Sequence, residues 1–207
     1  MTKRKLESIA KKYIIPSLGN YKLHGEFIIK LPIKDIVTGF CLERSSVLDC
    51  GYAWWFSQPL YAPYDLLHLT FGGRIEFGDG GQLWNFTKEQ IEQTMNLLTF
   101  KMKGLQKKLA LVEEPIDFYN YFKGEKENNL RIYEAVTYSA CWTMQPSMQR
   151  DIEECINFIL KEQNLSIPWI KTVLDNLRSI EALKDNEQIS YLLNKLKIAA
   201  LSKLKLE

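Results

Sequence analysis

Between residues 22 and 71, apolar side chains recur at every second position in four short runs. A period of two places those side chains on one face of a β-strand. The runs cover residues 22–31, 35–43, 47–58 and 65–71. Because no helical pattern separates them, they favour an antiparallel sheet over alternating strands and helices. The pattern therefore predicts an antiparallel sheet of about four strands.

Helical periodicity dominates the remainder of the chain. Residues 2–15 indicate a basic helix that ends at Pro16 and Gly19. From residue 87 to 112, apolar side chains recur in alternating steps of four and three. This seam consists of Ile91, Met95, Leu98, Met102, Leu105, Leu109 and Val112. It predicts one long helix whose seam packs within its own chain.

Four further helices are predicted after the long one, at about residues 129–144, 146–163, 167–184 and 187–204. The predicted fold class is therefore α+β, with an N-terminal helix, an antiparallel sheet and a helical C-terminal half of about five helices. We expect two parts. Residues 1–122 would form the sheet domain with the long helix 87–112, and residues 123–207 would pack on it as one compact unit.

The composition is that of an ordinary globular chain. It has 207 residues, 46% hydrophobic and 25% charged, with a formal net charge of +2. Such a charge provides no general basic field for nucleic acid. No apolar run approaches the ~18 residues of a membrane span. The four cysteines form no CxxC pair, and no secretory signal is evident, so we expect a reducing, cytoplasmic environment.

The stretch FGGRIEFGDGG, residues 71–81, resembles a phosphate-binding loop only in part. Gly73 and Gly78 have the GxxxxG interval, but Asp79 and Gly80 stand where lysine and a hydroxyl residue are required. An aspartate there would repel phosphate. The glycines are therefore interpreted as turn formers between the sheet and the long helix. A loop for another ligand, in which Arg74 pairs with a carboxylate, remains an alternative.

Candidate metal and nucleophile residues are few. His24, His68, Cys41 and Cys50 could in principle bind zinc. In a simple meander, however, the two histidines would lie on opposite edge strands, roughly 14 Å apart. Cys50 with His68 and Asp65 could form a thiol site on paper, although apolar-face cysteines usually pack in cores. We therefore predict no catalytic residue, no cofactor and no metal ion.

An aromatic cluster between residues 52 and 86 suggests where a partner could bind. The segment contains ten aromatic residues but only one Lys or Arg, Arg74. Stacking of nucleobases on it is therefore disfavoured. Strand parity sends Trp54 and Trp55 to opposite faces. Trp54 shares its face with an apolar row and is predicted to lie in the core. For Trp55, which stands beside small residues, our hypothesis is a partly open face; the alternative is that another helix or the basic N-terminal segment covers that face. The candidate binding surface comprises Asp49, Trp55, Arg74 and Asp79.

These observations favour a non-catalytic protein that acts by binding another protein, as an inhibitor, immunity or adaptor protein does. Two alternatives belong to other classes. One is a small enzyme with a site of Asp, Glu, Tyr and Arg at the rim of the sheet. The other is a module associated with nucleic acid.

Overall fold

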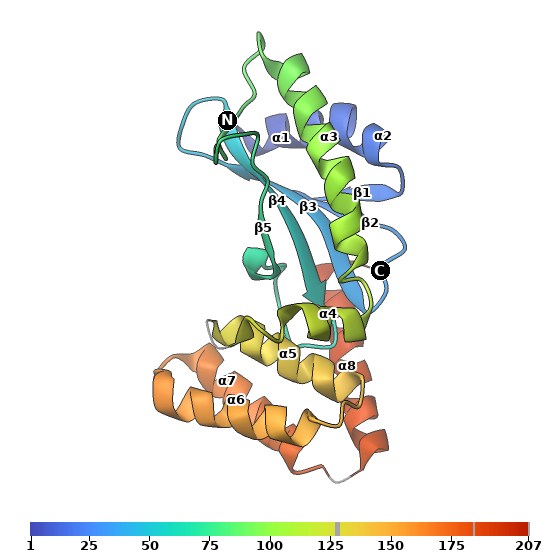
Figure 1. Cartoon of the computed structure of the whole chain (residues 1–207), viewed down its shortest axis with the longest axis vertical. Helices are drawn as coiled ribbons and strands as arrows, with labels where there is room; N and C mark the ends of the chain where they lie inside the picture. The colour runs from blue at the N-terminus through green and yellow to red at the C-terminus, as the bar shows by residue number, and fades with distance from the viewer. Residues whose placement is uncertain (127–128, 184, 207) are drawn as a thin grey trace. The chain divides into compact units, whose positions relative to one another are not determined.

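The computed structural model describes residues 1–126, 129–183 and 185–206. The fold is α+β, as predicted: an N-terminal helix precedes an antiparallel sheet, and helices form the C-terminal half (Figure 1). The chain divides into two compact units. Unit 1 contains residues 1–58 and 68–113, and unit 2 contains residues 59–67 and 114–207. The division after residue 113 precedes the expected boundary, and the segment 59–67 crosses from the sheet region into the helical unit.

The N-terminal helix of unit 1 has three consecutive parts. Helix α1, Lys3–Ile9, continues through a π-helical segment, Ala10–Ile14, into α2, Ile15–Leu18. Thr2 caps the start, since its side-chain oxygen accepts a hydrogen bond from the Lys5 backbone nitrogen. Gly19, with φ of 88°, ends the helix at the predicted glycine.

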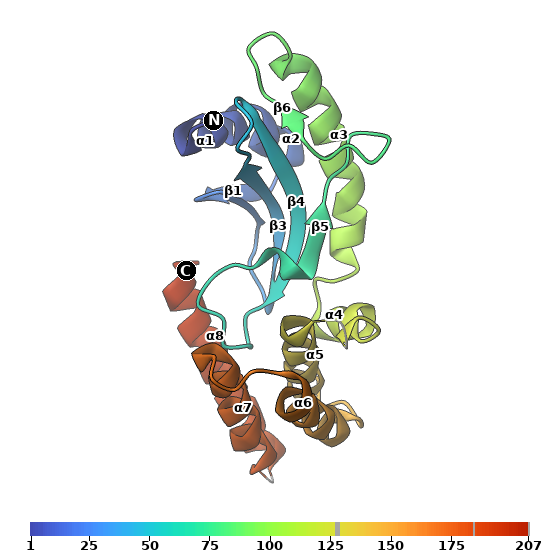
Figure 2. The ribbon, with the colours of Figure 1, turned by 90° about the vertical axis from the view of Figure 1, so that its left-hand side faces the viewer.

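The sheet has six strands rather than about four. The main order is β1-β2-β3-β4-β5, and β6 also pairs with β4 (Figure 2). The strands are β1 Tyr21–His24, β2 Phe27–Lys30, β3 Ile36–Arg44, β4 Cys50–Pro59, β5 Gly72–Arg74 and β6 Trp84–Asn85.

Two predicted strands differ from those observed. The run 22–31 folds into a hairpin, because Gly25 adopts a positive φ of 62° between β1 and β2. Residues 65–71, predicted to form a strand, contain instead the short 3₁₀ helix Leu69–Phe71. Strand β5, which pairs with β4, follows this 3₁₀ helix and lies within the glycine-rich stretch.

Helix α3, Ile91–Ala110, packs one side against the core of unit 1. Figure 1 shows it beside the sheet together with α1 and α2. The predicted seam packs inward within the chain. Met95, Leu98, Met102 and Leu109 are buried in one cluster with sheet residues that include Phe40. The prediction of intramolecular packing is confirmed.

Unit 2 is a group of helices around α5 (Figure 2). Its helices are α4 Pro115–Phe122, α5 Leu130–Trp142, α6 Met148–Glu162, α7 Pro168–Glu181 and α8 Asn186–Leu204. Helix α5 packs against α4, α6 and α8, and α6 packs against α7. Helix α4 was not predicted, and the predicted end of the third helix at residue 184 lies outside the described residues. No helix in the described part of the chain has the length and apolarity needed to cross a bilayer.

Candidate functional site

The two adjacent tryptophans of β4 lie on opposite faces of the sheet, as strand parity requires, but the covered face is that of Trp55. Trp55 is only 6% exposed, and it belongs to the core cluster beneath the helices. The prediction that this face is open is therefore wrong. The small residues Gly51 and Ala53 do not leave a trough; they make room for larger neighbours. A Cβ placed on Gly51 would lie 3.2 Å from the Phe86 ring, which fills that space.

The other face of β4 carries the more accessible rings. Tyr52 and Trp54 are half-buried, and the exposed Arg74 lies directly opposite Trp54 on β5. The Arg74 guanidinium carbon is 4.1 Å from the centre of the Tyr52 ring and 4.8 Å from that of Trp54. A cation in this position is attracted to both aromatic faces. We call Tyr52, Trp54 and Arg74 the arginine–aromatic patch.

Hydrogen bonds orient the members of this patch. The indole nitrogen of Trp54 donates to Glu43 Oε2 at 2.9 Å. Arg74 Nη1 donates to Gln82 Oε1 at 3.2 Å, and Gln82 Nε2 donates in turn to Glu76 Oε1 at 3.0 Å. Arg74 makes no ion pair with any residue that the structure describes. Two aromatic rings and one side-chain amide therefore orient the guanidinium of Arg74, and no described carboxylate neutralises its charge.

The four residues predicted as one binding surface are not brought together. Asp49 accepts a hydrogen bond from Lys5 Nζ at 2.7 Å, and this contact holds the pKa of the Asp49 carboxyl below its usual value. Trp55 lies in the core, and Arg74 is on the opposite face of the sheet. Asp79 is exposed in the glycine-rich turn. Only Arg74 belongs to the arginine–aromatic patch.

The glycine-rich stretch forms a tight turn. Asp79 and Gly80 both have positive φ, 45° and 76°, between Gly78 and Gly81, which bridge to each other. The Phe77 nitrogen donates to the Gly81 carbonyl at 2.9 Å. The glycines therefore act as turn formers, which agrees with the interpretation from the sequence.

Another glycine of the stretch allows two strands to approach. A Cβ on Gly72 would overlap the carbonyl oxygen of Trp55, against which β5 lies. A side chain at this position would push β5 away from β4. Since β5 also carries Arg74, Gly72 contributes indirectly to the arginine–aromatic patch.

The cysteine and histidine constellations are not assembled. Cys50 begins β4, whereas the His68 backbone nitrogen is bound to Gln58 near the other end of that strand, at 2.6 Å. Eight residues of strand separate the two ends by about 26 Å. Burial, followed by the charges of nearby carboxylates, raises the pKa of Cys41 to about 12, so its thiol stays protonated. Among the described residues, no cluster of three His, Cys, Asp or Glu side chains could bind a metal ion.

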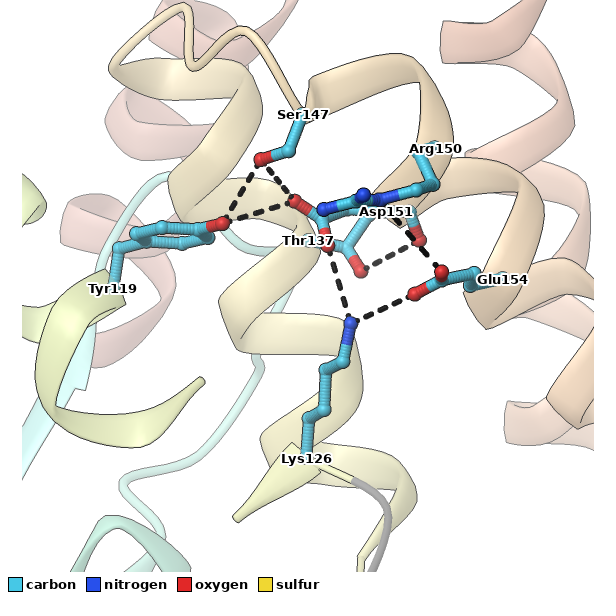
Figure 3. A network of polar contacts seen from close by, with 7 residues as sticks. All are labelled: Tyr119, Lys126, Thr137, Ser147, Arg150, Asp151 and Glu154. Atoms are coloured by element: carbon cyan, nitrogen blue, oxygen red, sulfur yellow. Dashed lines mark hydrogen bonds and ion pairs between the residues drawn. The ribbon is translucent and has the colours of Figure 1, made fainter. Parts of the chain in front are cut away.

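Unit 2 contains a polar network centred on the buried Asp151 (Figure 3). Its Oδ2 accepts hydrogen bonds from Ser147 Oγ at 2.8 Å and Tyr119 hydroxyl at 3.2 Å, and its Oδ1 lies 3.2 Å from Lys126 Nζ. Lys126 also pairs with Glu154 at 2.8 Å. Burial lowers the pKa of Lys126, but the bonds to both carboxylates outweigh it and raise that pKa overall. Because both Asp151 oxygens have partners, the network is interpreted as a structural tie between α4 and α6.

A second buried carboxylate in unit 2 is less well satisfied. Glu134 is fully buried on α5, and its Oε2 accepts a hydrogen bond from Arg131 Nη1 at 3.0 Å. Its Oε1 has no hydrogen-bond partner in the described part of the chain. Burial raises the pKa of Glu134 to about 7, although Arg131 opposes this shift. This cluster of Glu and Arg, with the nearby Tyr64, lies inside the helical unit rather than at the rim of the sheet.

The raised pKa of Glu134 predicts a pH-dependent stability of unit 2. Between pH 4.5 and about 7 the folded chain keeps a proton that the unfolded chain has lost, so the free energy of unfolding falls as pH rises through this window. At about pH 8, Glu134→Gln is expected to be more stable than wild type by about 2–3 kcal/mol. At about pH 5 the two should be similar. Hydrogen exchange of α5 amides in both proteins measures this difference.

The control for this prediction is Glu162→Gln, which neutralises an exposed carboxylate on α6. It should leave the difference between the two pH values unchanged. A Glu134→Gln protein that is less stable than wild type at both pH values would contradict the prediction.

Comparison with known proteins assigns no family to this chain: no family model matches it, and no curated protein and no solved structure is significantly similar. The function therefore has to be inferred from the geometry of the surface itself. The sequence contains one signal of the arginine–aromatic patch, since Arg74 is the only base near the aromatic cluster. Its position opposite Trp54 depends on the register of β4 and β5.

Proposed function

We propose that the protein is non-catalytic and binds another protein through the arginine–aromatic patch of unit 1. The observation that carries this proposal is Arg74, whose guanidinium lies over the rings of Tyr52 and Trp54 without an ion pair to any described residue. Tryptophan, tyrosine and arginine are the residues most enriched among binding hot spots. Here all three types lie on one accessible face.

The charges around the patch favour a protein over a nucleic acid as the partner. Glu43 and Glu76 are linked to the patch through Trp54 and Gln82, so two carboxylates accompany one guanidinium. A surface that stacks nucleobases needs several Lys or Arg side chains to neutralise the phosphates, and this patch has only Arg74.

The chemistry of Arg74 indicates what the partner presents. A guanidinium binds a carboxylate with two parallel hydrogen bonds, and only one of its nitrogens, Nη1, is bound to Gln82. The flanking rings reduce the cost of removing water from the charge on association. We therefore expect a partner with an Asp or Glu side chain at the centre of its interface, surrounded by apolar contacts with Tyr52 and Trp54.

The test is binding by matched variants. A tagged full-length chain is used to capture proteins from its source cells, and the stoichiometric partner is purified for calorimetry. Arg74→Ala and Trp54→Ala are each expected to weaken binding by about 30-fold or more, the loss typical of a hot spot. Loss of the carboxylate contact should also reduce the dependence of affinity on salt in Arg74→Ala.

Arg44→Ala is the control, because Arg44 is an exposed arginine at the end of β3 whose contact with Glu26 is loose, at 3.7 Å. This variant should bind like wild type. A partner whose affinity is unchanged by both Arg74→Ala and Trp54→Ala would show that binding uses another surface and would overturn the proposal.

A further inference from the structure

A cavity of about 320 Å³ lies in unit 1 between the glycine-rich turn and the first turns of α3. It is separate from the arginine–aromatic patch, with which it shares no residue. Its volume is within the range of sites that accept small organic ligands. Strand β6 contributes Trp84 and Asn85 to its lining, and α3 contributes Gln93 and Leu97.

The accessible aromatic ring of this cavity is that of Phe77, and the buried Trp84 supports it from behind. Phe77 and Trp84 meet edge to face, with ring centres 5.5 Å apart. The Trp84 indole nitrogen donates to the Ile75 carbonyl at 2.9 Å, which fixes that ring. Phe77 lies over Gly81, where an added Cβ would overlap its ring. The glycine-rich turn thus holds Phe77 in the wall, which gives it a role beyond reversing the chain.

The opposite part of the lining is polar and uncharged. Asn85, Gln90, Gln93 and Thr94 line it, and none of the described residues of the lining is charged. The side-chain amides of Gln90 and Gln93 make no hydrogen bond to any residue within the described ranges. Asn85 Oδ1 accepts a hydrogen bond from the Thr87 backbone nitrogen at 2.9 Å. Thr94 Oγ1 donates to the Asn85 carbonyl at 2.7 Å, so the exposed amides of Gln90 and Gln93 are the groups of this lining that can bind a ligand.

We infer that this cavity binds an uncharged carbohydrate unit. A primary amide presents a donor and an acceptor side by side, and a pair of neighbouring hydroxyl groups matches this combination. The apolar C–H face of a sugar ring suits the ring of Phe77, which is 41% exposed and packs on the buried Trp84, since aromatic rings accept such weak contacts. A fully apolar ligand would desolvate the amides of Gln90 and Gln93 without replacing their hydrogen bonds. A charged ligand would find no counter-charge in the lining.

Hydroxyl groups around a ring also fit the arrangement of the amides better than an extended peptide does. Gln90 is the N-cap of α3 and Gln93 lies three residues later in its first turn, while Asn85 comes from β6. The donors and acceptors thus approach the cavity from two elements. The hydroxyls of a pyranose diverge around the ring and can meet both, whereas the peptide groups of one strand alternate along a single line.

The experiment is a titration of the isotope-labelled full chain, followed by nuclear magnetic resonance of its side-chain amide and indole groups. The probes are glucose, galactose, N-acetylglucosamine, cellobiose, lactose and chitobiose, with glucuronic acid and N-acetylleucine methylamide as charged and peptide comparisons. At least one neutral sugar is expected to shift the amide signals of Gln90 and Gln93, with a dissociation constant on the order of 1 mM. Neither comparison compound should shift them.

Variants on the exposed surface separate binding from folding. Gln93→Ala is expected to weaken the sugar about tenfold, and Phe77→Ala to abolish measurable binding, while both keep the wild-type melting temperature. Asn96→Ala is the matched control, because Asn96 is exposed on α3 and does not line the cavity. It should bind normally. The inference is overturned if no sugar of the panel binds, if only the peptide binds, or if Gln93→Ala and Phe77→Ala leave affinity unchanged.

Discussion

Leu98→Asp is expected to unfold unit 1 or to yield insoluble protein. Leu98 is completely buried on α3, in the cluster that joins this helix to the sheet. The substitution removes apolar contacts and places a carboxylate among them without a partner. The expected loss is at least about 4 kcal/mol, a large part of the 5–15 kcal/mol that stabilises an ordinary domain. Solubility on expression and the circular dichroism of the purified protein measure the effect.

Phe100→Asp on the same helix is the control, since Phe100 is 72% exposed. It introduces the same charge close to the same point and should leave the protein folded. A soluble Leu98→Asp protein that melts at the wild-type temperature would show that the seam of α3 does not pack on the sheet.

Trp55→Ala is expected to destabilise unit 1 by about 3–5 kcal/mol, the usual cost of truncating a buried tryptophan. The ring packs in the core, Lys108 Nζ lies 4.3 Å from its centre, and Gly73 lies against its edge. The cavity left by the truncation cannot close, because β5 is held in place by its pairing with β4. Denaturant unfolding, with hydrogen exchange of α3 amides as the probe specific to unit 1, measures this loss.

Trp54→Ala provides the comparison. Its ring is half-buried, and its truncation removes the contact with Arg74 and the hydrogen bond to Glu43. We expect a loss of about 1–2 kcal/mol. Equal destabilisation by the two variants, or a greater loss in Trp54→Ala, would contradict the assignment of the two faces.

The seam of α3 shows how far periodicity can be trusted. Seven apolar positions in steps of four and three define one stripe on a helix, and any compact chain must cover such a stripe. Its residues, such as Met95 and Met102, are buried as expected. Helix α4 was not predicted, because recognition of a helix from periodicity needs several turns. It is only eight residues long, and it offers too few turns for a stripe to be distinguished from a loop.

Strand parity defined the two faces of β4 but could not tell which face the helices cover. Trp54 has the apolar neighbours in the sequence, so it was assigned to the core, whereas the structure buries Trp55. The rings that fill the space beside Trp55 belong to distant segments, such as Trp84 and Phe86. Small residues such as Ala53 are compatible with an open trough and equally with close packing. Only the positions of the covering elements distinguish these cases.

The sequence alone determined the α+β class, the antiparallel arrangement and the inward seam of α3, because each depends on periodicity within one segment. It also determined that the glycine-rich stretch forms a turn, since Asp79 and Gly80 stand where a phosphate loop needs other residues. The tertiary structure decided which face of the sheet is covered and placed Arg74 opposite Trp54. It also buried Glu134 completely, which raises the pKa of that carboxyl. These features depend on contacts between segments far apart in the chain, and local patterns do not encode the register or the neighbours of such contacts.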